Sequence, residues 1–253
     1  MDCPRGFCPD HIHFSHLRAM AKSPAHFRAL ETRPREDSLA MRIGRTIHAM
    51  VLGGDFVVYD GTRRGTEWAA FEQANLGREI ITFSEAAASR EVADAVLSHP
   101  RAADLLAGQH EAWLAWKLGR RACAGHLDVL GQNFITDLKT TTNAEPGWFA
   151  RHALQMGYAA QMAWYFDGVV AAGLPAPENV YVVAVETKYP YVISTFELTP
   201  RALEMGRKQY RLWFERVLIC EASNYWPGYI EGTAPLDAPD DNTLWIDGEE
   251  VAA

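Results

Sequence analysis

Long apolar stretches are missing from this chain of 253 residues. No run approaches the roughly 20 apolar residues that a membrane-spanning helix needs, and the first residues lack the apolar core of a secretory leader. We therefore expect a soluble protein of the cytoplasm. The chain also lacks internal repeats and low-complexity linkers, so we expect a single domain over residues 1–253.

An excess of positive charge is lacking too. Lys and Arg total 24 against 32 Asp and Glu, which gives a formal net charge of −8. This balance argues against a protein that coats nucleic acid non-specifically. The acids are unevenly placed, and six of them crowd the last segment: Asp237, Asp240, Asp241, Asp247, Glu249 and Glu250. Basic residues such as Arg42 and Arg45 lie elsewhere, so the balance does not argue against a local nucleic-acid channel.

Cysteine is scarce, with four residues at positions 3, 8, 123 and 220. Cys3 and Cys8 are followed closely by His11 and His13, and all four carry atoms that bind metals. The other two cysteines are isolated in the sequence. We favour a flexible N-terminal segment over a structural metal centre.

The sequence does contain two short apolar runs that each present an aspartate. They read Asp128-Val-Leu-Gly-Gln-Asn-Phe-Ile-Thr-Asp137-Leu138-Lys139. A turn at residues 131–133 would bring Asp128 alongside Asp137. Side chains alternate along a strand, so Asp137 and Lys139 point the same way and Leu138 points into the core. Two carboxylates this close repel each other unless a cation lies between them, which predicts a divalent-metal site with a lysine at its edge.

A simpler interpretation is a surface hairpin with a cross-strand ion pair, worth under about 1 kcal/mol. Two acids and a lysine on adjacent strands often occur by chance, so this pattern alone does not decide between the two interpretations.

The pattern around the acids predicts an α/β fold with the order helix, three strands, helix, strand. We expect a buried helix that ends at Gly53, irregular structure over residues 55–83 apart from a short helix at 66–75, and no regular pattern in the tail from Asn224. Strands are expected at 111–116, 122–130, 134–140, 180–186 and 191–198, and helices at 146–153, 158–172 and 201–222. The domain then divides into a mainly helical part (1–108), a core (109–222) and a C-terminal tail (223–253).

This order and the Asp128…Asp137-Leu138-Lys139 spacing resemble the PD-(D/E)XK nuclease superfamily. Three further motifs are similar to RecE-type phage and prophage exonucleases. They are Met41-Arg-Ile-Gly44-Arg-Thr-Ile-His48, Gly125-His-Leu-Asp128, and Gly157-Tyr-Ala-Ala-Gln161-Met-Ala-Trp-Tyr165. The resemblance implies a restriction-endonuclease-like core of the lambda-exonuclease type, with a central mixed sheet flanked by helices and an N-terminal helical elaboration.

The resemblance implies a metal site formed by His48, Asp128, Asp137 and the backbone carbonyl of Leu138. Lys139 would orient or deprotonate the attacking water and offset charge on the phosphate. For His48, the alternative is a hydrogen-bonded core histidine.

Further site residues follow from the same resemblance. Gln161 and Tyr165, one helical turn apart, would line the site; the alternative is that they cap the polar edge of an amphipathic helix. Glu111 would be an extra acid or a solvent-facing strand residue. Arg42 and Arg45 would contact DNA phosphates or be ordinary solvated charges.

The implied activity is Mg²⁺-dependent exonuclease digestion of linear double-stranded DNA from 5′ ends, with Mn²⁺ as a substitute metal and no iron–sulfur cluster. Implied partners are DNA, a RecT-like single-strand annealing protein and further copies of the chain in a ring, in a phage or prophage setting. Two alternatives stay open: a RecB-like endonuclease or repair nuclease, and a non-catalytic DNA-binding assembly factor.

Overall fold

A five-stranded sheet lies at the centre of the computed structural model, which describes residues 10–32, 38–236, 244–246 and 249–251. The sheet has the order β3-β4-β5-β6-β7, and only the β5–β6 pair is parallel. Its strands are β3 (Gln109–Leu118), β4 (Arg121–Leu130), β5 (Phe134–Thr141), β6 (Asn179–Glu186) and β7 (Ile193–Glu197). The predicted α/β class with a central mixed sheet is confirmed.

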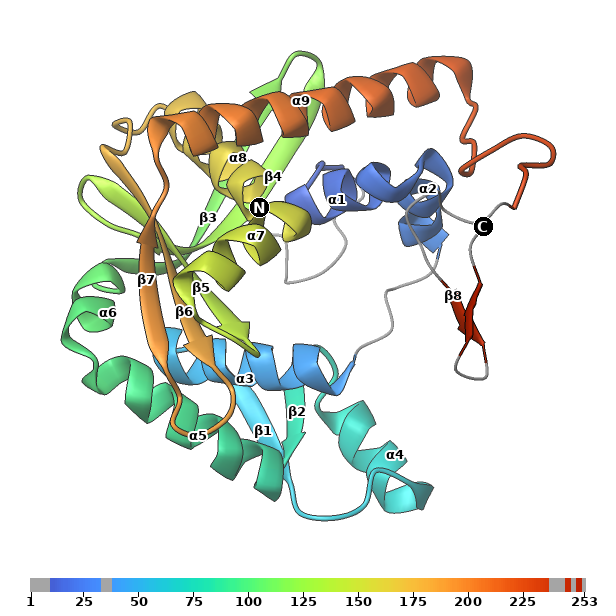
Figure 1. Cartoon of the computed structure of the whole chain (residues 1–253). Helices are drawn as coiled ribbons and strands as arrows, with labels where there is room; N and C mark the ends of the chain where they lie inside the picture. The colour runs from blue at the N-terminus through green and yellow to red at the C-terminus, as the bar shows by residue number, and fades with distance from the viewer. Residues whose placement is uncertain (1–9, 33–37, 237–243, 247–248, 252–253) are drawn as a thin grey trace.

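Helices cover both faces of this sheet (Figure 1). One face packs against α1 (Phe14–Lys22), α7 (Pro146–Met156), α8 (Tyr158–Ala171) and α9 (Pro200–Ser223). The other face packs against α3 (Leu39–Leu52), α5 (Phe83–Ser98) and α6 (Pro100–Leu105). Each face thus has its own hydrophobic core, and apolar residues fill the central strands because both of their faces are buried.

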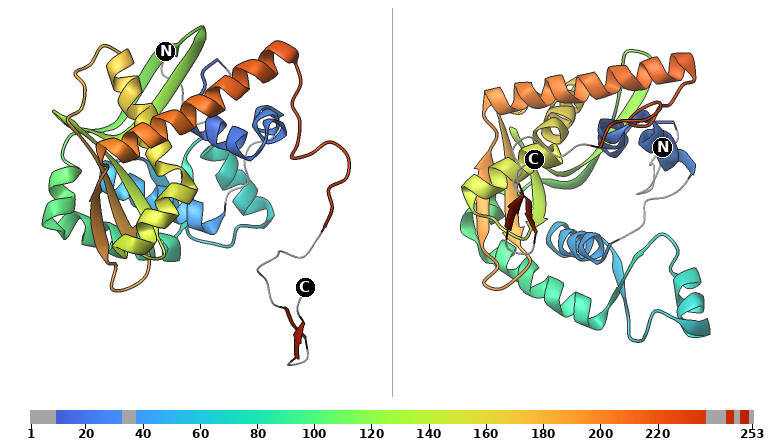
Figure 2. Two further views of the ribbon diagram at one scale, coloured as in Figure 1. Left: turned by 45° about the horizontal axis from the view of Figure 1, so that its top comes forward. Right: turned by 45° about the vertical axis from the view of Figure 1, so that its right-hand side comes forward.

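Local signals in the sequence set the ends of helices α3 and α9. Helix α3 begins after Ser38, whose hydroxyl accepts a hydrogen bond from the Met41 amide, and ends at Gly53 with φ +83°. Helix α9 begins after Thr199, whose hydroxyl accepts from the Ala202 amide, and has proline at its first position. Helix α9 contacts α8, α1 and α2 (Pro24–Thr32), which lie beneath it in Figure 2.

Two parts of the secondary-structure prediction were wrong. Residues 55–83 contain the parallel strands β1 (Phe56–Tyr59) and β2 (Glu79–Thr82), separated by α4 (Gly65–Ala74). Each strand has only four residues and its partner lies beyond a helix, so neither makes a clear local pattern. The tail also contains a short antiparallel hairpin, β8 (Leu244–Ile246) and β9 (Glu249–Val251).

The segment after α9 packs against the N-terminal helices. The ring of Trp226 stacks on Phe27 of α2, with ring centroids 5.3 Å apart, and Arg28 lies over the same indole. Among the described residues no helix combines the length and apolar character needed to span a bilayer. The division at residues 108 and 222 stays a prediction.

Candidate active site

The candidate site lies where β4 and β5 separate. Their ladder pairs Leu130 with Ile135 and Val129 with Thr136, and pairing then stops. Asp128 and Asp137 are the next residues on each strand, so they face each other at the opening of this fork. Beyond the fork, the edge of β4 is taken by Ile12, whose amide donates to the Ala122 carbonyl at 2.9 Å. The predicted turn at 131–133 therefore sets the register that brings the two aspartates together.

Asp128 satisfies a backbone group that the fork leaves unpaired. Its Oδ2 accepts a hydrogen bond of 2.7 Å from the Leu138 amide. The same oxygen lies 3.6 Å from Nδ1 of His48, which approaches from α3. Asp128 thus fixes the backbone of β5 and the imidazole of His48 at once.

Asp137 and Lys139 point to the same side of β5, as predicted, and Leu138 is fully buried on the other face. The Lys139 ammonium lies 2.6 Å from Asp137 Oδ2 and 4.9 Å from the ring centre of Tyr158. On the opposite side, Gln161 Nε2 donates to Asp137 Oδ1 at 3.3 Å. We call His48, Asp128, Asp137 and Lys139 the acid–lysine cluster.

Helix α8 borders this cluster with one polar face. Tyr158, Gln161 and Tyr165 lie three and four residues apart, which places them on the same side of the helix. Gln161 Nε2 also donates to the Tyr165 hydroxyl at 3.2 Å. Gly125 makes room for this tyrosine, because a Cβ at position 125 would lie 2.7 Å from Tyr165 Cε1.

Helix α3 approaches the cluster closely from the other face of the sheet. A Cβ at Gly44 would lie 3.2 Å from the Thr140 hydroxyl oxygen, so glycine lets the helix pack against β5. Helix α3 then carries His48 past the strand to Asp128.

Glu111 lies opposite Asp128 on the neighbouring strand. The β3–β4 ladder pairs His110 with Val129 and Ala112 with Leu127. Glu111 and Asp128 lie between these pairs and are not themselves paired in the ladder. Glu111 has φ +50°, a left-handed conformation that is uncommon for a non-glycine residue. Unusual backbone of this kind is concentrated at functional sites. The role of Glu111 as an extra acid stays a prediction.

The two aspartates have different pKa values because their surroundings differ. Burial is the largest effect on Asp137 and, with the Asp128 carboxylate, raises its pKa to about 6, although Lys139 opposes this rise. Burial also disfavours ionised Asp128, but His48, Lys139 and the Leu138 amide together hold its pKa below the usual value. Asp128 is therefore the firmly ionised member of the pair.

Burial and the two aspartates also determine the pKa values of Lys139 and His48. Burial favours neutral Lys139, but Asp137 and Asp128 outweigh it and raise the pKa of the ammonium above its ordinary value. Burial likewise opposes protonation of His48, and Asp128 reverses this effect, so the pKa of the imidazole is raised. Lys139 is thus a cation at neutral pH, and its ammonium lies against the Asp137 carboxylate, where it offsets part of the negative charge of the two aspartates.

The donor atoms of the cluster suit a hard divalent cation. Two carboxylates, an imidazole and a backbone carbonyl are ligands that Mg²⁺ or Mn²⁺ accepts. Asp137 Oδ2 is buried and accepts no hydrogen bond of normal geometry from the described residues. Within that part of the chain no three His, Cys, Asp or Glu side chains already surround a common point as a metal shell. A cation bound to Asp137 would require Lys139 to turn away from Oδ2.

The remaining predicted residues fall outside this arrangement. Arg45 forms an ion pair with Glu79, with Nε 2.5 Å from Oε2, and Arg42 lies 3.7 Å from Glu85. Their predicted DNA contacts stay a prediction. Cys3, Cys8 and the acids at 237, 240, 241 and 247 lie outside the described residues.

Sequence reasoning missed Tyr158. The signal was present, since Tyr158 precedes Gln161 by three residues and Tyr165 by seven, one continuous helical face. What the sequence does not show is that Lys139, from a different element, extends over the ring of Tyr158. The cation–π contact is a product of the tertiary fold.

The fold of this chain is similar to that of a solved structure. A crystal structure of a protein named as a putative exonuclease from Eubacterium rectale matches with a TM-score of 0.67 and 13% sequence identity, covering 90% of this chain and 91% of that chain. At this identity the match shows a shared fold. A search of curated proteins finds no match.

The family comparison covers most of the sequence. Residues 13–238 match the model of a PDDEXK-like domain of unknown function (DUF3799). The predicted relationship to the PD-(D/E)XK nucleases is therefore confirmed at the level of the superfamily fold. The chain belongs to this family of PDDEXK-like domains.

Proposed function

We propose that this protein is a metal-dependent DNA exonuclease that degrades linear double-stranded DNA from its 5′ ends and leaves 3′ single strands for recombination by annealing. The observation that carries the proposal is the acid–lysine cluster, in which Asp128, Asp137 and Lys139 meet at the fork between β4 and β5. Burying carboxylates costs free energy, and buried acids with shifted pKa values are concentrated at functional sites. A nuclease site accounts for this arrangement, because its carboxylates would bind the metal ion.

Hydrolysis of a phosphodiester needs an in-line water and relief of the charge that builds on the phosphate. A bound Mg²⁺ or Mn²⁺ lowers the pKa of water and neutralises that charge. Asp128, Asp137, His48 and the Leu138 carbonyl would hold the ion.

Lys139 is better suited to charge neutralisation than to taking a proton from water. Its pKa is raised by the two aspartates, so at neutral pH the ammonium is present and can contact a phosphate oxygen or orient the water. Gln161 fixes one oxygen of Asp137 and would keep this carboxylate in place while Lys139 moves.

The finer features of the proposal rest on resemblance. The motifs around His48, Asp128 and Gln161 are similar to RecE-type exonucleases, and the matching crystal structure is of a protein named as a putative exonuclease. By the same argument we propose Mg²⁺ as the working metal, a RecT-like annealing protein as partner, a ring-shaped homo-oligomer, and a cytoplasmic setting in a phage-infected or lysogenic bacterium.

The rival nuclease function is endonucleolytic cleavage of the RecB-like type, which would use the same cluster. The test is digestion of one plasmid, supplied linearised and closed-circular, with Mg²⁺ or EDTA, by wild type and by Lys139→Ala. The proposal predicts that only wild type with Mg²⁺ degrades DNA, and only the linear form.

Two other results would contradict the proposal, and each would favour a different function. Cutting of the circle would make the protein an endonuclease. No cutting of either form would favour the non-catalytic binding factor. A duplex labelled at one 5′ or one 3′ end then tests polarity, since a 5′ exonuclease releases the 5′ label first.

A further inference from the structure

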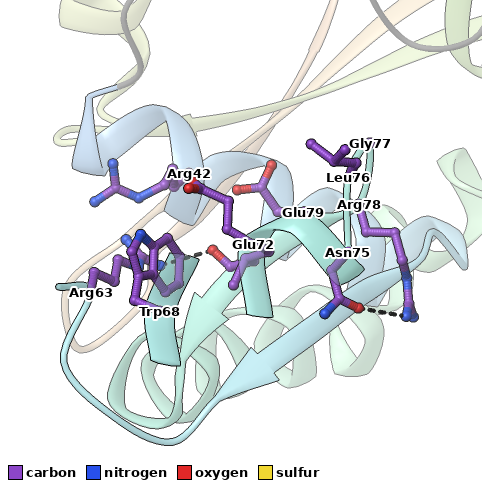
Figure 3. Close-up of a pocket in the computed structure, with 10 residues that line it drawn as sticks. Arg42, Arg63, Trp68, Glu72, Asn75, Leu76, Gly77, Arg78 and Glu79 are labelled. Atoms are coloured by element: carbon purple, nitrogen blue, oxygen red, sulfur yellow. Dashed lines mark hydrogen bonds between the residues drawn. The ribbon is translucent and has the colours of Figure 1, made fainter. Parts of the chain in front are cut away.

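A second polar pocket lies beside α3, away from the carboxylates. It has a volume of about 380 Å³, opens to solvent, and is lined by residues of α3, α4, β2 and the segments on either side of α4. Figure 3 shows Trp68 and Arg63 side by side at one end, with Arg42 and Glu72 next to them. The volume is in the range of small-molecule sites.

Arg63 is held rigidly at this end of the pocket. Its Nη2 donates to the Ile80 carbonyl at 2.8 Å and to Glu85 Oε2 at 2.7 Å. The guanidinium carbon lies 5.7 Å from the ring centre of Trp68. Arg63 thus packs over one face of the Trp68 ring, and together they give the pocket a fixed lining that a flat ligand can contact without ordering a mobile side chain.

Helix α4, which supplies Trp68, contributes little to the protein core. None of its residues is buried. Trp68 and Phe71 hold it in place through ring contacts with Tyr59, with ring centres 5.1 and 4.8 Å apart. A short helix without a buried face gains little stability from packing, so its role is better explained by the surface it presents.

The acids around the pocket are largely neutralised by arginines. Glu79 pairs with Arg45 at 2.5 Å, and Glu85 contacts both Arg63 and Arg42. These pairs reduce the repulsion that an anionic ligand would meet. Arg42 lies at the edge of the pocket nearest α3 and is placed to contact a phosphate.

The pocket and the acid–lysine cluster share helix α3. Arg42 and His48 are six residues apart, or about 9 Å along the helix axis. The two residues also lie about 120° apart around the helix. Stacked nucleotides advance about 3.4 Å each along one strand, so at least two or three of them are needed to span the distance.

We propose that this pocket binds an unpaired nucleotide of the DNA substrate, with its base stacked on Trp68 and Arg63 and its phosphate near Arg42. The inference rests on the proposed nuclease function, because it supplies the strand that leaves the cleavage site. It adds a single-strand subsite at least two or three nucleotides from the cluster.

Binding of a fluorescent single-stranded oligonucleotide, followed by anisotropy, tests the proposal without cleavage. All variants carry Lys139→Ala so that DNA stays intact. Loss of one base–aromatic stack predicts about tenfold weaker binding for Trp68→Ala. Gln73→Ala, at an exposed position of the same helix outside the pocket, should bind as the parent does. Binding of a hairpin-capped duplex should not change in any Trp68 variant.

The arginine is tested with its neighbour as control. Arg63→Ala should weaken single-strand binding severalfold, whereas Arg64→Ala removes the same charge outside the pocket and should change it less. Equal effects of Trp68→Ala and Gln73→Ala, or unchanged binding by Trp68→Ala with normal circular dichroism, would overturn the subsite. If wild type cuts no DNA but the Trp68 dependence holds, the nuclease proposal fails and the subsite stands.

Discussion

At the scale of single residues, Lys139 and Asp137 have separable roles. In the structure the Lys139 ammonium forms an ion pair with Asp137 Oδ2, so it competes with any metal ion for that oxygen. Lys139→Ala should therefore bind Mn²⁺ at least as tightly as wild type while losing nuclease activity, and Asp137→Ala should bind at least tenfold more weakly. Calorimetric titration with Mn²⁺ measures both. Equal loss of metal affinity in the two variants would contradict this assignment.

Gly125 is expected to control the position of Tyr165. A methyl group at Gly125 would lie 2.7 Å from a ring carbon of Tyr165, and overpacking of this kind costs about 1–3 kcal/mol. Gly125→Ala should lower the urea midpoint and reduce cleavage. Gly228→Ala is the matched control, since a Cβ there meets nothing within 4 Å. The account requires that Tyr165→Leu in the Gly125→Ala background restores stability; failure to do so would place the strain elsewhere.

The same residues show how far sequence alone can predict this site. Asp128 and Asp137 are predictable because a turn at 131–133 and the two-residue strand period fix their register. The cation–π contact of Lys139 with Tyr158 and the pairing of Arg45 with Glu79 join segments whose distance in the sequence carries no signal. Pairings of this kind depend on the tertiary fold.

At the scale of elements, the contact between α8 and α9 is unusually close. A Cβ at Gly206 would lie 2.1 Å from the Ala159 carbonyl oxygen, a backbone atom that cannot swing aside. Glycine to alanine normally stabilises a helix by about 1 kcal/mol. Here the sign should reverse, and Gly206→Ala should destabilise the protein by about 3 kcal/mol in urea unfolding. Glu215→Ala, exposed on the same helix, should change stability little; a stable Gly206→Ala would show that the helices lie further apart.

The start of α1 should make stability depend on pH. Burial lowers the pKa of His13 and His16 to about 4 from an ordinary 6.5, and for His13 the nearby histidines add to this effect. Nδ1 of His16 also accepts a hydrogen bond from the His13 amide, which a protonated Nδ1 cannot do. Between pH 6.5 and 4 the unfolded chain therefore binds protons that the folded chain does not, so stability falls as pH falls and is unaffected above this window.

A pKa lowered by one unit corresponds to about 1.4 kcal/mol, and solvent screening of the half-buried His13 reduces its part of the effect. We expect these two histidines to contribute a loss of about 1 kcal/mol between pH 7.5 and pH 5, while the raised pKa values of Asp137 and His48 act in the opposite direction. Urea midpoints at the two pH values measure it, with the His13→Gln, His16→Gln double variant as control. An equal pH dependence in the double variant would assign it to other groups.

Elements differ in how well the sequence predicts them. The core strands and α9 were predictable because capping residues and long apolar runs are local signals. The β1–β2 pair was not, because two four-residue strands gain their stability from a partner beyond α4 and not from their own pattern.

At the scale of the whole molecule, processive digestion would require the protein to stay on one DNA end through many cycles. A net charge of −8 gives little general attraction to DNA. A closed ring of several copies retains DNA by topology and does not depend on such attraction. Light scattering should therefore show an oligomer. A monomer that still degrades DNA processively would contradict the ring.

The most direct test of the central claim is the rate at which wild type and Lys139→Ala cleave a linear duplex in Mg²⁺ under single-turnover conditions. The account predicts Mg²⁺-dependent cleavage by wild type, abolished by EDTA, and a loss of at least a hundredfold in Lys139→Ala at unchanged DNA affinity. Cleavage by Lys139→Ala at the wild-type rate would show that the acid–lysine cluster is not where the reaction takes place.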